Sequence, residues 1–156
     1  MKKIVIAPDK FKGSLTGIEF CDAVERGIKK HISKINIAKL PLADGGDGTV
    51  DALKFYTGGQ LIAVKVHDPL MRPITAKYLF SEKNHLAFIE MAAASGIRLM
   101  KKEELKPLET TTFGTGELIL DAIKKKAKHI ILGIGGSSTN DAGTGMARAL
   151  GFRFLD

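Results

Sequence analysis

Short apolar runs alternate with stretches of helical spacing over the first third of the chain. The runs are typical of buried strands and span residues 3–7, 35–40 and 61–66. After the first run, Thr16 and Glu19 have the spacing of a capping box, which predicts a helix from there to about His31. A second helix is predicted over about 50–56, ended by the glycines 58–59. Strands that alternate with helices are typical of the α/β class, with a parallel sheet covered by helices.

The pattern changes after Asp68-Pro69. Two strand-like runs, 74–80 and 85–90, are joined by the polar residues 81–84 and predict an antiparallel hairpin. The remaining predicted elements are a helix over 116–126, a strand over 129–134 and a helix that ends near Gly151. We therefore place a domain boundary between residues 66 and 72, which divides the chain into 1–67 and 68–156.

The last residues, 152–156, resemble the beginning of a strand. A strand edge left there would expose unpaired backbone and apolar side chains. We therefore expect the natural chain to continue, and we expect an isolated chain of this length to self-associate into oligomers or aggregates.

The net charge of +7, from 24 basic and 17 acidic residues, suits an anionic ligand. Much of the excess lies in the lysines of 124–128, at the end of a predicted helix, where cations complement the helix dipole. Because no nucleic-acid motif accompanies the charge, nucleic acid is not an expected partner.

Cys21 is the single cysteine, so no internal disulfide can form, and its helical spacing with apolar neighbours indicates a buried thiol. No run approaches the ~18 apolar residues of a membrane helix. The amino terminus also lacks the apolar stretch of a signal peptide. We therefore expect a cytoplasmic protein without membrane partners.

Five segments concentrate small, polar and charged residues at the predicted ends of elements, where ligands bind in open α/β sheets. The first segment, 7–15, follows the first strand. Within it, Lys12 could neutralise phosphate or carboxylate, and Asp9 could hold Mg²⁺ or accept a proton. Ser14 is a candidate binding residue, although a helix cap is the alternative for its hydroxyl.

The second segment, 41–49, places two carboxylates among glycines at a helix entrance. Mg²⁺ takes one or two protein carboxylates, with phosphate and water completing its shell. Asp44 and Asp47 are therefore candidate metal ligands, and Gly45 and Gly46 could direct backbone N–H groups toward an anion. A turn with either aspartate as a helix cap is the alternative.

The third and fourth segments are 89–96 and 110–117. Glu90 closes an apolar run and could act as a base or ligand, with capping of the next turn as the alternative. The fourth segment carries hydroxyls, glycines and a carboxylate before a helix, a combination that can bind an anion. The candidate binding residues of these two segments are Glu90, Ser95, Thr112, Gly114, Thr115, Gly116 and Glu117.

The fifth segment, 133–145, is the richest in glycines and small polar residues, and it joins a predicted strand to a helix. Backbone N–H groups and three hydroxyls there could cradle phosphate or the carboxylate of a substrate. The candidate binding residues are Gly135, Gly136, Ser137, Ser138, Thr139, Asn140 and Asp141.

Together these segments closely resemble the bacterial glycerate kinase family. The matching stretches, in chain order, are 7–15, 43–49, 89–96, 114–117 and 133–141. They extend over essentially the whole chain. Asp47 stands where a glutamate is common in the family, a change that keeps the charge but shortens its reach.

The resemblance implies an activity. The family phosphorylates D-glycerate with ATP and Mg²⁺, and many bacterial members give 2-phosphoglycerate. It implies that Asp44 and Asp47 hold metal or hydroxyl groups and that Lys12 meets phosphate or carboxylate. We take Asp9, Lys12 and Asp44 as the candidate catalytic residues. Two alternatives stay open: a non-catalytic nucleotide- or anion-binding module, and a kinase for another small hydroxy acid.

The resemblance also implies a two-domain fold. Family members join a Rossmann- or flavodoxin-like domain, built from both chain ends, to a second α/β domain inserted between them. Residues 1–67 would form the first part of the former, and 68–156 the first part of the latter, with a mixed sheet. Since family members are more than twice this long, the absent half is expected to carry the catalytic base. The 156 residues alone are therefore expected to be inactive.

Overall fold

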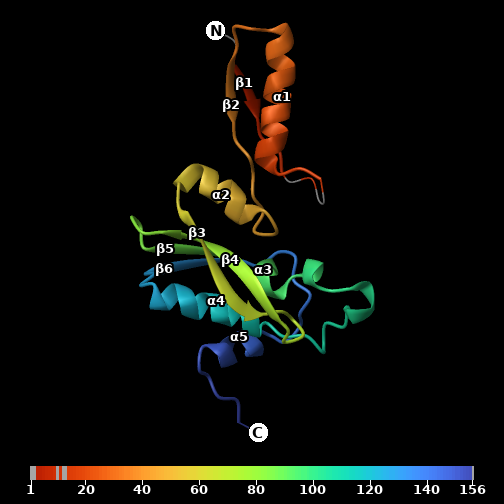
Figure 1. Ribbon diagram of the computed structural model, residues 1–156, viewed down its shortest axis with the longest axis vertical. Helices are drawn as coiled ribbons and strands as arrows, with labels where there is room; N and C mark the ends of the chain where they lie inside the picture. Colours follow the sequence, from red (N-terminus) through yellow and green to blue (C-terminus); the bar gives the residue numbers. More distant parts are fainter. Residues whose placement is uncertain (1–2, 10, 12–13, 156) are drawn as a thin grey trace.

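The computed structural model describes residues 3–9, 11 and 14–155. In its amino-terminal part, strands β1 (Lys3–Ile6) and β2 (Asn36–Lys39) form a parallel two-stranded sheet. Helix α1 (Gly17–His31) connects them and packs beside the sheet (Figure 1). The predicted capping box is confirmed, because the Thr16 hydroxyl accepts the Glu19 N–H at 3.2 Å and the Glu19 carboxylate accepts the Thr16 N–H at 2.8 Å.

The second part is built on a four-stranded mixed sheet in the order β3-β4-β5-β6. The strands are β3 (Gln60–His67), β4 (Pro73–Ser81), β5 (Leu86–Glu90) and β6 (His129–Gly133). The predicted hairpin of β4 and β5 is confirmed as an antiparallel pair, and β6 pairs parallel to β5. Both sheets together make this an α/β structure, as predicted.

One strand lies in a different sheet from the one that the alternation predicts. The run at 61–66 is a strand, but β3 pairs antiparallel with β4 along its whole length, from Gln60–Phe80 to His67–Pro73. The prediction that this run extends the parallel sheet is therefore wrong. The physical reason is the tight turn at Asp68, whose carboxylate accepts the N–H groups of Leu70 and Arg72 at 2.8 and 2.9 Å and returns the chain along β3.

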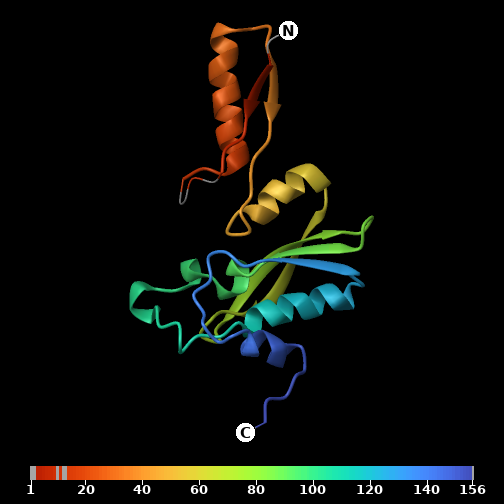
Figure 2. The same ribbon diagram turned by 180° about the vertical axis from the view of Figure 1, so that it is seen from behind.

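Helices cover both faces of the mixed sheet (Figures 1 and 2). Helix α2 (Thr49–Thr57) packs on β4 and β5 from the side of the amino-terminal part, and α4 (Phe113–Lys124) covers the opposite face. Helix α5 (Thr144–Ala149) packs against α4. The buried apolar cluster lies mainly between the sheet and α4, and comprises Val66, Ala76, Tyr78, Phe80, Ala87, Ile89, Ala94, Leu118 and Ala122.

The connection from β5 to α4 contains the short helix α3 (Ala92–Ser95) and the 3₁₀ turns η1 (Ile97–Leu99) and η2 (Lys102–Glu104). Helix α4 begins at Phe113, three residues before its predicted start. Residues 152–155 form no strand, contrary to the prediction, because a strand needs a hydrogen-bonded neighbour and the described chain provides none there. Within the described residues, no helix is long and apolar enough to cross a membrane.

Candidate active site

The loops that follow β1 and β2 leave the parallel sheet side by side. The backbone pairing of the two strands continues past their ends, because Leu40 N–H donates to Ile6 O and Leu42 N–H donates to Pro8 O, both at 2.8 Å. The first two motif segments therefore lie next to each other, with Asp9 in one loop and Asp44 in the other. This is the edge of the sheet where ligands bind in open α/β folds.

The acidic loop, residues 44–48, also lies directly against the loop that follows β6. Gly135 N–H donates to Gly45 O at 3.1 Å. A Cβ atom on Gly133 would lie 2.5 Å from Gly45 O, and one on Gly135 would lie 2.7 Å from Gly46 Cα. These glycines are therefore required for the close approach of two backbones. The contact joins the amino-terminal sheet to the mixed sheet through two motif segments that lie far apart in the sequence.

Short hydrogen bonds fix the conformation of the acidic loop. The Asp44 carboxylate accepts Gly46 N–H at 2.8 Å, and the buried Thr49 hydroxyl accepts Gly45 N–H at 3.0 Å. Sequence reasoning missed Thr49, although its position as the first residue of a helix after a glycine-rich loop could have indicated a bracing hydroxyl. The loop is held as a defined turn in front of α2.

Glu90, at the end of β5, caps α2 from a distant part of the chain. The residue before that helix is Gly48, which has no side chain to cap it and adopts a left-handed conformation with φ 88°. The Glu90 carboxylate instead accepts Val50 N–H at 2.6 Å. A carboxylate at this position also favours the positive end of the helix dipole. The contact ties the acidic loop to the end of β5, and the binding role predicted for Glu90 stays a prediction.

Asp47 faces an arginine that sequence reasoning missed. The Arg98 guanidinium in η1 lies 3.8 Å from Asp47 Oδ2, and the two side chains are 67% and 32% exposed. The signal in the sequence was a single basic residue two positions after Gly96. Next to this pair, Asp47 Oδ2 lies 3.8 Å from the Cβ position of Gly136, so the acidic loop, η1 and the loop after β6 meet here.

Several backbone N–H groups of the polar loop 135–141 already donate hydrogen bonds within the protein. Ser138 N–H donates to Ser95 O at 2.9 Å and Thr139 N–H donates to the Ser137 hydroxyl at 3.1 Å. Asn140 N–H donates to Pro107 O at 3.0 Å. In this conformation an anion would meet the Ser137 and Thr139 side chains before these N–H groups. The predicted binding role of the loop stays a prediction.

Asp141 joins the starts of two helices. Its carboxylate accepts Thr112 N–H at 2.8 Å, before α4, and the N–H groups of Gly143 and Gly145 at 3.0 Å, before and within α5. Burial tends to raise the pKa of Asp141, but the hydrogen bonds from Thr112, Gly145 and Gly143 together lower it below 3.8. This distant cap explains why α4 starts earlier than predicted.

Close packing accounts for the glycines of the fourth segment. A Cβ atom on Gly114 would lie 1.8 Å from His67 O, and one on Gly116 would lie 2.4 Å from Met146 O. The Glu117 carboxylate accepts His67 N–H at 2.7 Å, which ties α4 to the end of β3. Ser95 and Thr115 share a buried hydroxyl–hydroxyl contact of 2.7 Å. Binding roles for Gly114, Thr115, Gly116, Glu117 and Ser95 remain predictions beside these structural contacts.

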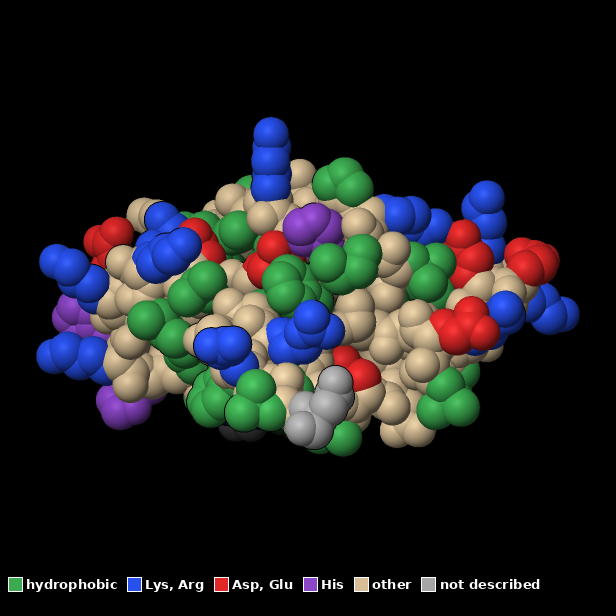
Figure 3. Space-filling view, turned by 90° about the horizontal axis from the view of Figure 1, so that it is seen from below, with side chains coloured by type: hydrophobic (Ala, Val, Ile, Leu, Met, Phe, Trp, Pro, Cys, Tyr) green, Lys and Arg blue, Asp and Glu red, His purple; other side chains and the backbone are tan. Residues whose placement is uncertain are grey.

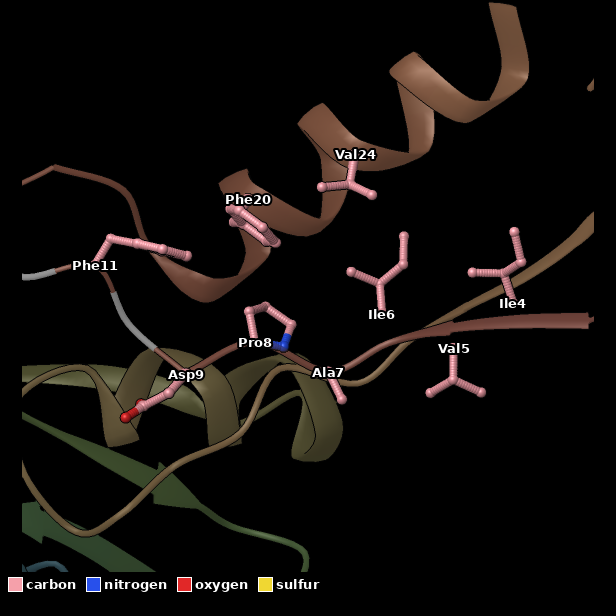
Figure 4. A pocket seen from close by; sticks show the side chains of 9 residues that line it. All are labelled: Ile4, Val5, Ile6, Ala7, Pro8, Asp9, Phe11, Phe20 and Val24. Carbon is pink, nitrogen blue, oxygen red and sulfur yellow. The ribbon is translucent and has the colours of Figure 1, made fainter. Parts of the chain in front are cut away.

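The first segment borders an open hollow between β1 and α1 (Figure 4). The lining is mainly apolar, with the rings of Phe11 and Phe20 stacked at 4.6 Å, while the Asp9 side chain points away from the apolar groups. Ser14 lies in a turn in which its N–H donates to Phe11 O at 3.0 Å. Lys12 lies outside the described residues, so its catalytic role stays a prediction.

Two carboxylates in one loop suit a hard cation such as Mg²⁺, which prefers oxygen ligands and takes few of them from protein. The Asp44 and Asp47 carboxylates fit that donor set, with one Asp44 oxygen already accepting an N–H group. Among the described residues, no three acidic, histidine or cysteine side chains group together as a metal site. The two carboxylates therefore fit a hard cation that takes few ligands from protein.

Comparison with known proteins gives a consistent result. The sequence profile of the glycerate kinase family matches residues 4–156. The chain is 51% identical over 154 residues to a glycerate kinase of Bacillus cereus, covering 99% of this chain and 40% of that protein. It is 47% identical over 154 residues to the glycerate 2-kinase of Escherichia coli K12, with 99% and 40% coverage.

The same similarity holds in three dimensions. The crystal structure of a Salmonella typhimurium LT2 protein, provisionally assigned as glycerate kinase 2, superposes with a TM-score of 0.81 at 49% identity. The match covers 96% of this chain and 40% of that one. The chain thus spans about 40% of the length of these relatives. Since the family profile covers nearly every residue, this chain belongs to the glycerate kinase family.

Proposed function

We propose that the protein transfers the γ-phosphoryl group of ATP to D-glycerate and forms 2-phosphoglycerate. One observation carries the proposal: the acidic loop 44–48 packs against the loop after β6, and α2, which directly follows the acidic loop, is capped by Glu90 at the end of β5. Membership of the glycerate kinase family and similarity to a protein named glycerate 2-kinase support it.

Phosphoryl transfer depends mainly on positioning and on neutralising charge, because the protein contributes little covalent chemistry. In our proposal the Asp44 and Asp47 carboxylates hold Mg²⁺, which when bound neutralises negative charge on the phosphate oxygens. Lys12 meets phosphate or carboxylate, and Asp9 either holds the metal or accepts a proton. The hydroxyls of Ser137 and Thr139, which lie 2.9 Å apart, are proposed to contact an anionic group of a substrate.

The rigid placement of the acidic loop matters for this chemistry. A misplacement of reacting groups by 1 Å can cost about a hundredfold in rate. The bonds from Gly135 to Gly45 and from Val50 to Glu90 hold this loop against two strand ends at 3.1 and 2.6 Å. We propose that this bracing, and not additional ligands, is the main contribution of Glu90 and Gly135.

We further propose that residues 1–67 belong to a Rossmann- or flavodoxin-like domain and 68–156 to a second α/β domain. The separate β1–β2 pair and mixed sheet support two units, but β3 pairs within the mixed sheet and α2 packs on it, so these two elements lie with the second unit. We also propose that the 156 residues by themselves do not catalyse the reaction, because they cover about 40% of the relatives' length. Steady-state rates of the isolated chain, measured beside an intact relative, test this last point.

The main proposal is tested by measuring ADP release from the purified full-length protein with ATP, Mg²⁺ and a panel of acceptors. We expect D-glycerate to give the highest kcat/KM, compared with L-glycerate, glycolate and lactate, and phosphorus NMR to identify 2-phosphoglycerate. A higher kcat/KM with another hydroxy acid would show that this acid, and not D-glycerate, is the preferred substrate. Nucleotide binding without turnover of any acceptor would instead indicate a non-catalytic binding module.

A further inference from the structure

Arg98 lies in the segment 96–104, and Arg72 lies in the β3–β4 turn, which contacts that segment. The two arginine side chains differ sharply in the number of hydrogen bonds that they form. Arg72 is saturated: its Nε donates to Asp68 Oδ2, its Nη1 to Glu104 at 2.8 Å, and its Nη2 to Leu99 O at 3.2 Å. These contacts link the turn after β3 to η1 and η2. Arg72 is therefore a structural residue that holds the segment carrying Arg98.

Arg98 has the same chemistry and almost none of these contacts. Within the described chain its guanidinium forms one ion pair, at 3.8 Å from Asp47 Oδ2, which is too long for a hydrogen bond. Its side chain is 67% exposed. The N–H donors of the group are therefore left to solvent beside the acidic loop.

The backbone that carries Arg98 is nevertheless fixed. Ile97 N–H donates to Gly136 O at 2.9 Å, and Gly96 forms a β-bridge with Ser137. Leu99 N–H donates to Gly96 O at 3.1 Å, which closes the η1 turn. Arg98 therefore combines a fixed backbone with an exposed guanidinium.

The charges at this edge indicate which class of ligand the guanidinium suits. The acidic loop and the β5 end carry the carboxylates of Asp44, Asp47 and Glu90, and Arg98 forms an ion pair with one of them, Asp47. Both substrates of the proposed reaction are anions, and a guanidinium suits carboxylate and phosphate because it can donate two parallel hydrogen bonds. The Arg98 guanidinium therefore supplies positive charge and N–H donors beside Asp47, where such a ligand would approach.

We propose that Arg98 is a substrate-binding residue that donates to an anionic oxygen group, a carboxylate of the acceptor or a phosphate of the nucleotide. In the structure its guanidinium lies 3.8 Å from Asp47 Oδ2. This inference rests on the proposed function for the identity of the two substrates. It adds a residue and a recognition role that the motif segments do not contain.

The experiment compares the full-length wild-type enzyme with its Arg98→Gln and Arg98→Lys variants. KM and kcat are measured for ATP and for D-glycerate separately. We expect Arg98→Gln to raise the KM of one substrate about tenfold, the scale of one lost charged hydrogen bond, with kcat changed less than about threefold. Arg98→Lys should fall between, because a lysine keeps the charge but loses the paired donors. A raised KM for ATP would show that Arg98 binds a phosphate group of the nucleotide. A raised KM for D-glycerate would show that it binds the carboxylate of the acceptor.

Lys102→Gln is the matched control, since it removes an exposed cation four residues away on η2 and should leave both KM values unchanged. Unchanged KM values in both Arg98 variants, in an active wild-type enzyme, would overturn the inference and leave the proposed function intact. A wild-type enzyme without kinase activity would refute the proposed function instead. In that case calorimetric titration with ADP and with D-glycerate decides on Arg98, because equal affinities of wild type and Arg98→Gln for both probes would overturn its role.

Discussion

Gly133 and Gly135 have no room for a side chain because the backbone of residues 45–46 lies against them. Gly27 in helix α1 contrasts with them, since a Cβ atom there would meet nothing within 4 Å. Glycine is therefore required at the loop contact and replaceable in the helix, although the sequence shows the same residue at both places.

Gly135→Ala should destabilise the protein by about 1–3 kcal/mol, the usual range for a group forced into a packed region. The new Cβ atom would lie 2.7 Å from Gly46 Cα, so the acidic loop must move. Gly27→Ala should stabilise the protein by about 0.5–1 kcal/mol, because alanine loses less backbone entropy in a helix. Chemical denaturation of both variants measures the two values. Equal effects would show that the loops do not pack as described.

The Asp141 carboxylate predicts a loss of stability in acid. Its folded pKa lies below the ordinary value of 3.8, because hydrogen bonds from Thr112 and two glycines outweigh the effect of burial. A lowered folded pKa contributes stability that is present above about pH 4 and is lost as the pH falls through the folded pKa. Asp68 has a lowered pKa as well and contributes in the same direction.

The Asp141→Asn variant should therefore lose stability at pH 7 and show a shallower fall in stability between about pH 4 and pH 2. Urea denaturation across this range tests the slope. The wild-type protein, measured over the same pH range, is the control. An Asp141→Asn variant with the wild-type slope would remove this residue from the acid response.

At the scale of elements, α2 depends on a cap from another strand. Glu90→Ala removes the acceptor of Val50 N–H, now at 2.6 Å, and should lower stability by about 1–2 kcal/mol, as helix caps do. Hydrogen exchange at the start of α2 should become faster, while exchange in α1 should not change. Glu90→Gln keeps an oxygen acceptor and should lose less. Wild-type exchange rates in the alanine variant would contradict the capping role.

The local pattern predicted most of these elements because a strand or helix leaves its own periodicity in the sequence. It did not predict the partner of β3, since the apolar run at 61–66 is compatible with a parallel or an antiparallel neighbour. The start of α4 was also missed. Its cap, Asp141, lies 29 positions away from the Thr112 N–H that it accepts, so no local signal marks it.

For the candidate site, the sequence indicated the positions of the segments along the chain but not the contacts between them. Glycine-rich and acidic segments at the ends of predicted elements indicated candidate loops, because ligands bind at such ends in open α/β sheets. The contacts between the loops were not predictable, and they change several interpretations. Gly114 is explained by its contact with His67 O, and Arg98 carried no motif at all.

At the scale of the whole molecule, two sheets are joined by a contact between loops. The chain covers about 40% of the length of its relatives. Large apolar side chains are exposed near its carboxyl end, with Phe152, Phe154 and Leu155 at 67%, 57% and 85%. The face seen from this end carries hydrophobic side chains interspersed with basic ones (Figure 3). We expect the isolated 156 residues to self-associate, which light scattering would show.

The central claim is that the carboxylates of the acidic loop take part in phosphoryl transfer. The Asp44→Asn variant of the full-length protein tests this claim most directly. Asparagine keeps an oxygen that can accept Gly46 N–H, so the loop and the melting temperature should be preserved. The loss of the charge should lower kcat with ATP and D-glycerate about a hundredfold, the scale of removing one group that stabilises transition-state charge. The control Asp51→Asn should keep the wild-type rate. A folded Asp44→Asn enzyme with wild-type kcat and wild-type Mg²⁺ dependence would contradict the claim and reduce Asp44 to a residue that shapes the turn.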